Sequence, residues 1–160
     1  MDAYLWYGKG NVQRSRGWDV NNMSEADLQT KVLRLLWCYN GIPVENPKKI
    51  GTPDVAFIHG WIECKYLDQY PVKKGTIVRI EHFTGKQRLW LMKHSAFGGN
   101  CFLWLQVGKE HLIFKGWYAA KHVGRVTANE LRKNALYHSL VFPNITKLTE
   151  IGIICSSKTV

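Results

Sequence analysis

The sequence predicts an α/β protein from the order of its patterned segments, its size and its composition. A helical pattern comes first, short β-patterned runs follow it, and a second helical pattern precedes two apolar runs joined by a turn. This order is typical of a sheet covered by helices. The chain has 160 residues, 46% hydrophobic and 21% charged, which is enough for one substantial core. We therefore expect one domain over residues 1–160, with a basic, aromatic arm at 1–22 and a C-terminal extension at 140–160.

The first predicted helix begins after Ser24, which suits an N-cap, with Asp27 at the capping-box position. Apolar residues then recur with helical spacing until Asn40-Gly41, a pair that is typical of a helix end. Short strands are expected at residues 42–45, 54–58 and 61–66. The last two of these strands are expected to form a hairpin that turns at His59-Gly60.

The second half of the chain is predicted to alternate loops, helices and strands in the same way. Thr84 and Gln87 form a second capping box, so a helix is expected from there to Ala96. Around this helix we expect a loop at 67–76, an extended segment at 77–80, a hairpin of 101–107 with 111–114, a helix at 128–138 capped by Thr127, and a last strand at 151–155.

The charge balance favours a polyanionic partner. Twenty-two Lys and Arg against twelve Asp and Glu give a net charge of +10, and basic proteins gain affinity for nucleic acid by releasing its counterions. An anionic membrane surface is the weaker alternative, because no basic amphipathic helix accompanies the charge. No run approaches the roughly 20 apolar residues that span a bilayer, and the N-terminus lacks the apolar core of a signal peptide. We therefore expect a cytoplasmic protein with no membrane partner.

The four cysteines show no C-x-x-C pair and no other metal-ligand spacing. Most of them stand in apolar runs, where a thiol behaves as a small hydrophobic side chain. We interpret Cys38, Cys64, Cys101 and Cys155 as structural thiols of a reducing compartment rather than as a zinc site.

Three charged residues stand at the ends of the predicted hairpin, in GTPDVAFIHGWIECK at residues 51–65. Alternate residues of a strand share a face, so Glu63 and Lys65 point the same way. With a two-residue turn at His59-Gly60, Asp54 lies opposite Lys65 and joins them on that face. One face then carries Asp54, Ala56, Ile58, Trp61, Glu63 and Lys65, and the other, apolar face carries Val55, Phe57, Ile62, Cys64 and Tyr66. A three-residue turn would separate the charges.

Two carboxylates and one ammonium on one face suit phosphodiester chemistry. Carboxylate oxygens bind Mg²⁺, usually with water and substrate phosphate completing its shell. Such a cation activates a bound water and neutralises phosphate charge, and a lysine beside it stabilises developing negative charge. The alternative is a surface ion pair between Asp54 and Lys65, which contributes only about 0.2–1 kcal/mol.

Pro53-Asp54, followed after eight residues by Glu63-Cys64-Lys65, resembles the motif of the PD-(D/E)XK nuclease superfamily. The resemblance implies a restriction-endonuclease-like αβββαβ core, in which a mixed central sheet is flanked by helices. The VRR-NUC branch of small viral and bacterial nucleases places a glutamate and a glutamine in the first helix, as Glu25 and Gln29 stand here. It also tends to carry a glutamine early in the second helix, which Gln87 matches.

The resemblance implies a Mg²⁺-dependent endonuclease, with Mn²⁺ able to substitute. Asp54, Glu63 and the backbone carbonyl of Cys64 would hold the metal, and Glu25 would act through a water or a second metal. Lys65 would hold the attacking water or stabilise the transition state, and Gln87 would shape the site. Each residue also has a structural interpretation: Glu25 suits a helix N-terminus, Gln87 a capping box, and Gln29 a solvated helix face.

Four cations near the proposed site, namely Lys73, Lys74, Lys86 and Arg88, are candidates for phosphate contacts. A solvated charged face is the commoner use of such residues. In the arm, Trp6 and Trp18 are candidates for stacking on bases.

The function that the resemblance implies is cleavage of branched DNA, and specifically resolution of four-way (Holliday) junctions. Two matched nicks are simplest for a two-fold homodimer. The apolar residues of the arm at Tyr4–Tyr7 and of the tail at Ile151–Cys155 are candidates for its interface, and packing onto the same subunit is the alternative for them. A flap or single-strand nuclease of the same fold is the alternative among enzymes. A non-catalytic nucleic-acid-binding protein on a nuclease fold, or a basic viral assembly factor, is the alternative outside them.

Overall fold

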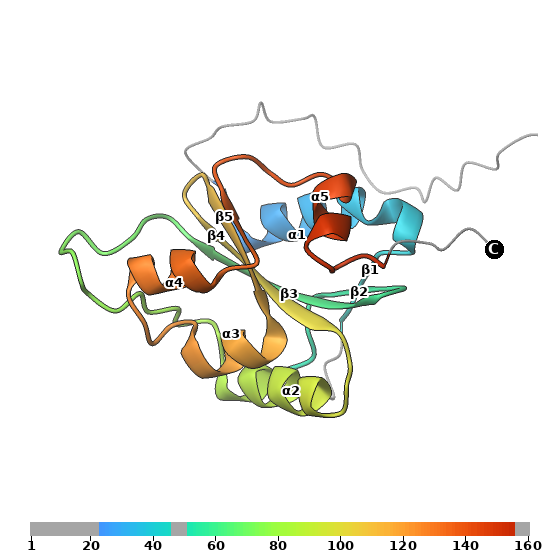
Figure 1. Cartoon of the computed structure of the whole chain (residues 1–160), viewed down its shortest axis with the longest axis horizontal. Helices are drawn as coiled ribbons and strands as arrows, with labels where there is room; N and C mark the ends of the chain where they lie inside the picture. Colours follow the sequence, from blue (N-terminus) through green and yellow to red (C-terminus); the bar gives the residue numbers. More distant parts are fainter. Residues whose placement is uncertain (1–22, 46–50, 156–160) are drawn as a thin grey trace, which may run out of the picture.

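The computed structural model describes residues 23–45 and 51–155, so the predicted arm, with Trp6, Trp18 and Tyr4–Tyr7, lies outside the described residues. A six-stranded sheet with the order β1-β2-β3-β4-β5-β6 forms the centre, and helices cover both of its faces (Figure 1). The strands are β1 Ile42–Pro43, β2 Val55–Phe57, β3 Gly60–Leu67, β4 Cys101–Val107, β5 Glu110–Lys115 and β6 Tyr137–Ser139. The helices are α1 Glu25–Leu35, α2 Gly85–Ala96, α3 Gly116–His122, α4 Ala128–Asn134 and α5 Ile145–Glu150, with a 3-10 turn at Trp37–Tyr39.

The sheet is mixed, as predicted. All neighbouring strands pair antiparallel except β3 and β4, which are parallel. Parallel neighbours require a crossover, and the chain between β3 and β4 makes it with α2. Every residue of β4 is buried, which explains why CFLWLQV is apolar almost throughout: a central strand covered on both faces has no solvent side.

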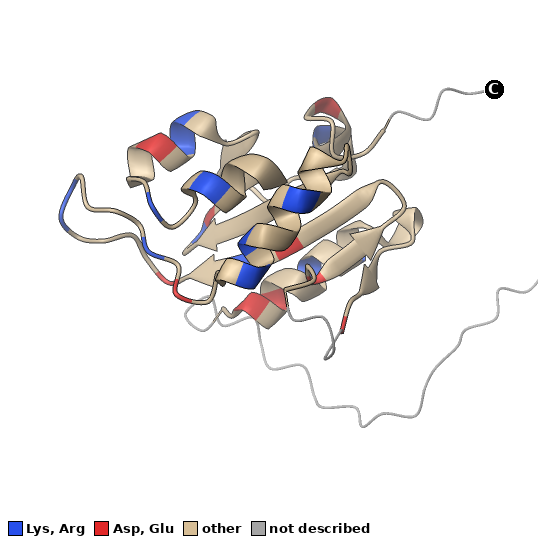
Figure 2. Ribbon diagram, turned by 90° about the horizontal axis from the view of Figure 1, so that it is seen from below, with Lys and Arg blue, Asp and Glu red and all other residues tan. Residues whose placement is uncertain are grey.

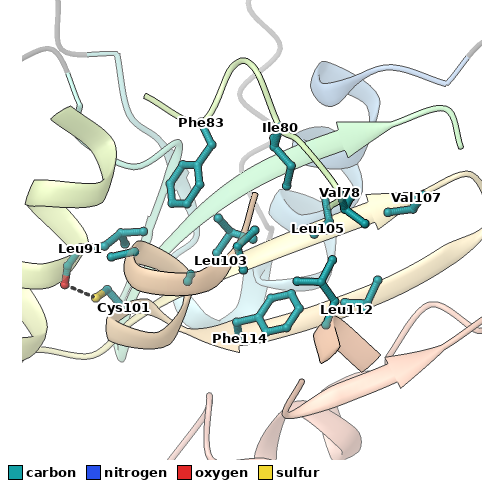
Figure 3. Packing of buried hydrophobic residues seen from close by; sticks show 14 residues of the cluster. Val78, Ile80, Phe83, Leu91, Cys101, Leu103, Leu105, Val107, Leu112 and Phe114 are labelled. Carbon is teal, nitrogen blue, oxygen red and sulfur yellow. Dashed lines mark hydrogen bonds between the residues drawn. The ribbon is translucent and has the colours of Figure 1, made fainter. Parts of the chain in front are cut away.

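Two hydrophobic clusters hold the helices on opposite faces of the sheet. One cluster joins α1 and α5 to the apolar face of the β2–β3 hairpin. The other joins α2, α3 and α4 to the opposite face, and Figure 3 shows its side chains between the sheet and the segment that precedes α2. As predicted, Val55, Ile62 and Cys64 are fully buried on the first face and Phe57 nearly so. No helix in 23–45 or 51–155 is long and apolar enough to cross a membrane.

The three predicted capping boxes are all present. Ser24, Thr84 and Thr127 each accept a side-chain hydrogen bond from the backbone N–H three residues on. The side chain of that third residue in turn accepts a hydrogen bond from the backbone N–H of the cap. These contacts satisfy backbone donors that the first helical turn leaves free. The sequence signal was therefore strong enough to place the beginning of α1, α2 and α4.

The hairpin register differs from the predicted one by one residue pair. The turn is at Ile58-His59, and Gly60 is already the first residue of β3, opposite Phe57. A Cβ at Gly60 would lie 2.5 Å from the carbonyl oxygen of Asn100, so the strand begins where only glycine fits. By this register Asp54 comes level with Glu63 instead of Lys65. The parity of the loop is unchanged, so the residues of one face remain together.

Several other predicted elements are wrong. The segment at 77–80, predicted to be extended, joins no strand of the sheet and makes a single bridge from Ile77 to Thr127. The helix predicted at 128–138 ends at Asn134, where the chain turns into β6, and the tail predicted as a strand follows α5 as a turn. Helix α3 was not predicted, because its seven residues, GWYAAKH, are too few to show a helical period. Of the four predicted structural thiols, Cys38 and Cys155 are exposed.

The tail packs within its own subunit. Ile153 and Ile154 are buried, with exposed fractions of 0% and 1%, in the cluster under α1 and α5. These two side chains are therefore not available for a dimer interface, and packing onto the same subunit is the predicted alternative that holds for them.

Candidate active site

The candidate site lies where β3 extends beyond its neighbour. Strand β2 begins at Val55, opposite Ile62, whereas β3 continues to Leu67. The edge of β3 beyond that pair is therefore free of β2, and the segment around Asp54 and the beginning of α1 meet there. Residues of β3, α1, α2 and the segment around Asp54 converge at this edge, because α2 reaches it from the other face of the sheet.

Asp54 is fixed by hydrogen bonds on both sides. Its Oδ2 accepts a hydrogen bond from the Cys64 backbone N–H at 2.8 Å, and the Gln29 side chain donates to its carbonyl oxygen at 3.2 Å. The N–H and C=O of a strand residue point to the same side, so the Cys64 carbonyl faces the edge where Asp54 lies. Gln29 thus has a specific role that a solvated helix residue would not have.

Gly51 brings the segment before Asp54 against the start of α2. Its φ is +104°, and a Cβ there would lie 2.7 Å from the backbone of Lys86. Both the backbone conformation and the close approach require glycine. The sequence analysis missed this residue, although a glycine two residues before the Pro53-Asp54 pair is the only local signal of it.

Lys65 lies between two carboxylates. Its Nζ is 2.7 Å from Glu25 Oε1 and 2.8 Å from Glu63 Oε1, and only 2% of the residue is exposed. An ammonium has three hydrogens to donate, so these contacts leave one for a water or a phosphate oxygen. Glu25, at the first position of α1, therefore reaches the same site as the β3 residues.

Glu63 is the most buried acid of the group, with no exposed surface. Its Oε1 forms an ion pair with Lys65 Nζ and accepts a hydrogen bond from the Gln87 side-chain amide. Its Oε2 is buried without a hydrogen-bond partner. A buried carboxylate oxygen with no partner is costly, and at a convergence of charged groups it indicates a ligand.

Gln87 acts both as a capping-box residue and as a residue of the site. Its Oε1 accepts from the Thr84 backbone N–H at 2.9 Å, as in a capping box, while its Nε2 donates to Glu63. The start of α2 is therefore tied to the acid on β3 through a single side chain.

The pKa values of the site follow from burial and mutual repulsion. Burial, followed by the charge of Asp54, raises the pKa of Glu63 to about 8. Burial also raises the pKa of Asp54, against the hydrogen bond from Cys64. For Lys65, burial alone would lower the pKa, but Glu63 and Glu25 outweigh it and raise the value. Two neighbouring acids with raised pKa values are stabilised in their charged forms by a bound cation, so such a pair favours cation binding.

The donor set fits a hard divalent cation such as Mg²⁺. Asp54 and Glu63 supply carboxylate oxygens, the Cys64 carbonyl faces the same edge, and Glu63 Oε2 has no other partner. Within the described parts of the chain no three His, Cys, Asp or Glu side chains group as a metal site. The cation would therefore take the rest of its shell from backbone carbonyl, water and phosphate oxygens, as Mg²⁺ commonly does.

The four predicted phosphate contacts lie in different settings. Lys86 is exposed in the first turn of α2, next to Gln87, and Lys73 and Lys74 are exposed on the loop after β3. Arg88 instead points into the protein: its guanidinium donates to the Ala119 and Ala120 carbonyls and packs over the Phe83 ring. Arg88 thus helps to join α2 to α3, and its contact with phosphate stays a prediction.

Comparisons with family models, with curated proteins and with solved structures find no match to this chain.

Proposed function

We propose that the protein is a metal-dependent endonuclease that hydrolyses phosphodiester bonds in DNA. The observation that carries the proposal is the buried Glu63 carboxyl group. Its Oε1 contacts Lys65 and Gln87, and its Oε2 is buried without a hydrogen-bond partner. A structural ion pair would not need a second acid, and a partnerless carboxylate oxygen would weaken it. A nuclease that binds Mg²⁺ there needs both features.

The fold supports the same proposal. The order α1-β1-β2-β3-α2-β4, with β3 and β4 parallel, agrees with the αβββαβ core expected for the PD-(D/E)XK superfamily. Glu25, Gln29 and Gln87 contact Lys65, Asp54 and Glu63 respectively. These three contacts are what supports placing the chain near the VRR-NUC branch, because they involve the residues that distinguish that branch.

Each residue has a role in hydrolysis that follows from its contacts. A bound Mg²⁺ would supply a water of lowered pKa and neutralise charge on the phosphate. Asp54 and Glu63, with the Cys64 carbonyl, would hold the cation, and Glu25 would contribute through a water or a second metal. Lys65 directs its remaining donor to the attacking water or to the phosphate oxygen that gains charge. The attacking water loses a proton to solvent and its oxygen bonds to phosphorus, the P–O bond to one sugar breaks, and the leaving sugar oxygen takes a proton from solvent to become a hydroxyl. Gln87 keeps the Glu63 carboxylate in place.

The proposed substrate is branched DNA, and within it the four-way junction. The net charge of +10 favours a polyanion, and one site per chain favours a homodimer for a two-fold substrate. Ile153 and Ile154 of the tail are buried in their own chain, so the support for a dimer is the two-fold symmetry of the proposed substrate. An intracellular location and a part in DNA recombination or repair follow from such a substrate.

A panel of labelled duplex, flap, single-stranded and four-way-junction DNAs, and the matching RNAs, tests the proposal. We expect cleavage only with Mg²⁺ or Mn²⁺, and strongest cleavage of the junction. Preference for flaps or single strands would select the alternative enzyme. Binding with no cleavage of any substrate in either metal would select a non-catalytic binding protein.

A further inference from the structure

A second concave surface lies between the loop that follows β3 and the start of α4. Its cavity measures about 330 Å³. Three cationic side chains and no acidic one are among the residues that line it, which are Tyr70, Pro71, Lys73, Lys74, Gly75, Thr76, Thr127, Ala128, Asn129 and Arg132. Figure 2 shows this loop projecting on the side of α4, with basic positions at its far end. We name this surface the loop–α4 pocket.

The base of the loop–α4 pocket is fixed by a buried acid. Arg132 donates two hydrogen bonds to Glu110, at 2.8 and 3.0 Å, and its guanidinium lies 4.6 Å from the centre of the Tyr70 ring. Glu110 is the first residue of β5 and only 7% exposed. Two of the five guanidinium N–H groups are used in this way, and Arg132 keeps donors for a ligand in a fixed orientation.

The two walls are also held together. The backbone N–H of Thr76 donates to the Lys73 carbonyl at 3.3 Å, which closes a turn with Gly75 at a φ of +79°. Next to it, Ile77 bridges Thr127, so the loop with the lysines stays against α4. Glu110 offsets one of the three positive charges, and the lysines leave an excess of two. The pocket therefore offers a preformed, positively charged cavity with hydroxyl and amide groups.

We propose that the loop–α4 pocket binds a phosphate of the nucleic acid strand away from the scissile bond. The inference rests on the proposed function for its choice of ligand. Tyr70 stands five positions after Lys65. This is at most about 17 Å of extended chain, or about five nucleotide steps along a strand. The pocket is therefore within about five nucleotides of the active site for a strand that runs towards it, and a phosphate contact there would fix the register of the strand without reading its sequence.

The test compares Lys73→Ala/Lys74→Ala with Lys93→Ala/Lys109→Ala, a control that removes the same charge from exposed lysines outside the pocket. Binding to junction and duplex DNA is measured without divalent cation, so that no strand is cut. We expect the pocket variant to weaken binding by about tenfold and to lower the log–log salt slope by about one. The control is expected to change affinity much less. Equal losses in both pairs would overturn the proposal.

A neutral methylphosphonate, placed at each nucleotide in turn, locates the contact. In the wild type, one position within about five nucleotides of the cleaved bond should lose affinity, and in Lys73→Ala/Lys74→Ala that position should no longer matter. A second arm removes the terminal 5′-phosphate, which separates an end-binding pocket from one for internal phosphate. The inference is overturned if neither arm shows a loss of affinity that depends on the pocket lysines. If such a loss occurs but no substrate is cleaved, the proposed nuclease fails while the pocket stands.

Discussion

Glu63 Oε1 lies 2.8 Å from Lys65 Nζ, and neither residue has more than 2% of its surface exposed. The pair is one residue apart on the same face of β3, so the strand itself fixes the contact. Burying two charges costs more than a simple ion pair recovers. This site therefore reduces the stability of the fold, as is common where function requires unsatisfied groups.

Glu63→Gln should raise thermal stability while abolishing cleavage. Burial and the charge of Asp54 disfavour the charged form of Glu63 and raise its pKa to about 8; the uncharged glutamine amide, of nearly the same shape, does not carry this penalty. Lys65 keeps Glu25 as a partner. Thermal unfolding without metal measures the gain, and cleavage of the preferred DNA measures the loss. A lower Tm than wild type would show that the Glu63 charge stabilises the protein.

Mg²⁺ should raise the Tm of the wild type but not that of Asp54→Asn or Glu63→Gln. A ligand that binds only the folded state stabilises it by mass action, by about 2.7 kcal/mol at 100 times Kd. Glu150→Gln, on the exposed face of α5, is the matched control and should respond like the wild type. An unchanged shift in Asp54→Asn would place the cation elsewhere.

Lys65→Ala should abolish cleavage and should also reduce stability. The burial of Lys65 between Glu25 and Glu63 predicts a cost of about 1–3 kcal/mol in the free energy of unfolding when the lysine is removed. Affinity for DNA should change little, since most of it comes from other phosphate contacts. Urea unfolding and binding without metal give the two values. Lys65→Ala combined with Glu63→Gln should recover most of the stability, and failure to do so would refute the coupling.

Glu110 should make stability depend on acid pH. Burial would raise its pKa, but hydrogen bonds from Arg132 and His138 outweigh it and lower the pKa to about 2, from an ordinary 4.5. A lowered carboxyl pKa stabilises the fold above about pH 4.5, and this contribution is lost as the pH falls towards 2. Urea unfolding between pH 6 and 2.5 should therefore show a steeper loss for wild type than for Glu110→Gln. Parallel curves would contradict this.

Local signals explain which parts of the fold and site were predictable. Ser24, Thr84 and Thr127 start helices through bonds within three residues, and the loop parity placed Asp54, Glu63 and Lys65 on one face. The register depended instead on Gly60 meeting Asn100, a contact forty residues away. Arg132 and Glu110 likewise meet only after folding. Tertiary contacts of this kind leave no period or motif in the sequence, which is why the loop–α4 pocket was not foreseen.

Junction cleavage should require a dimer. Two nicks on opposing strands need two sites related by a two-fold axis, whereas each chain brings Glu25, Asp54, Glu63 and Lys65 together only once among its described residues. Sedimentation at working concentration should give twice the mass of 18.5 kDa, and cleavage mapped on all four arms should give symmetric nicks. Mixing wild type with excess Glu63→Gln tests the requirement directly. Heterodimers keep one working site, so single nicks should accumulate in place of resolved duplexes. A monomer that nicks one strand, with an unchanged pattern in the mixture, would favour the flap or single-strand nuclease.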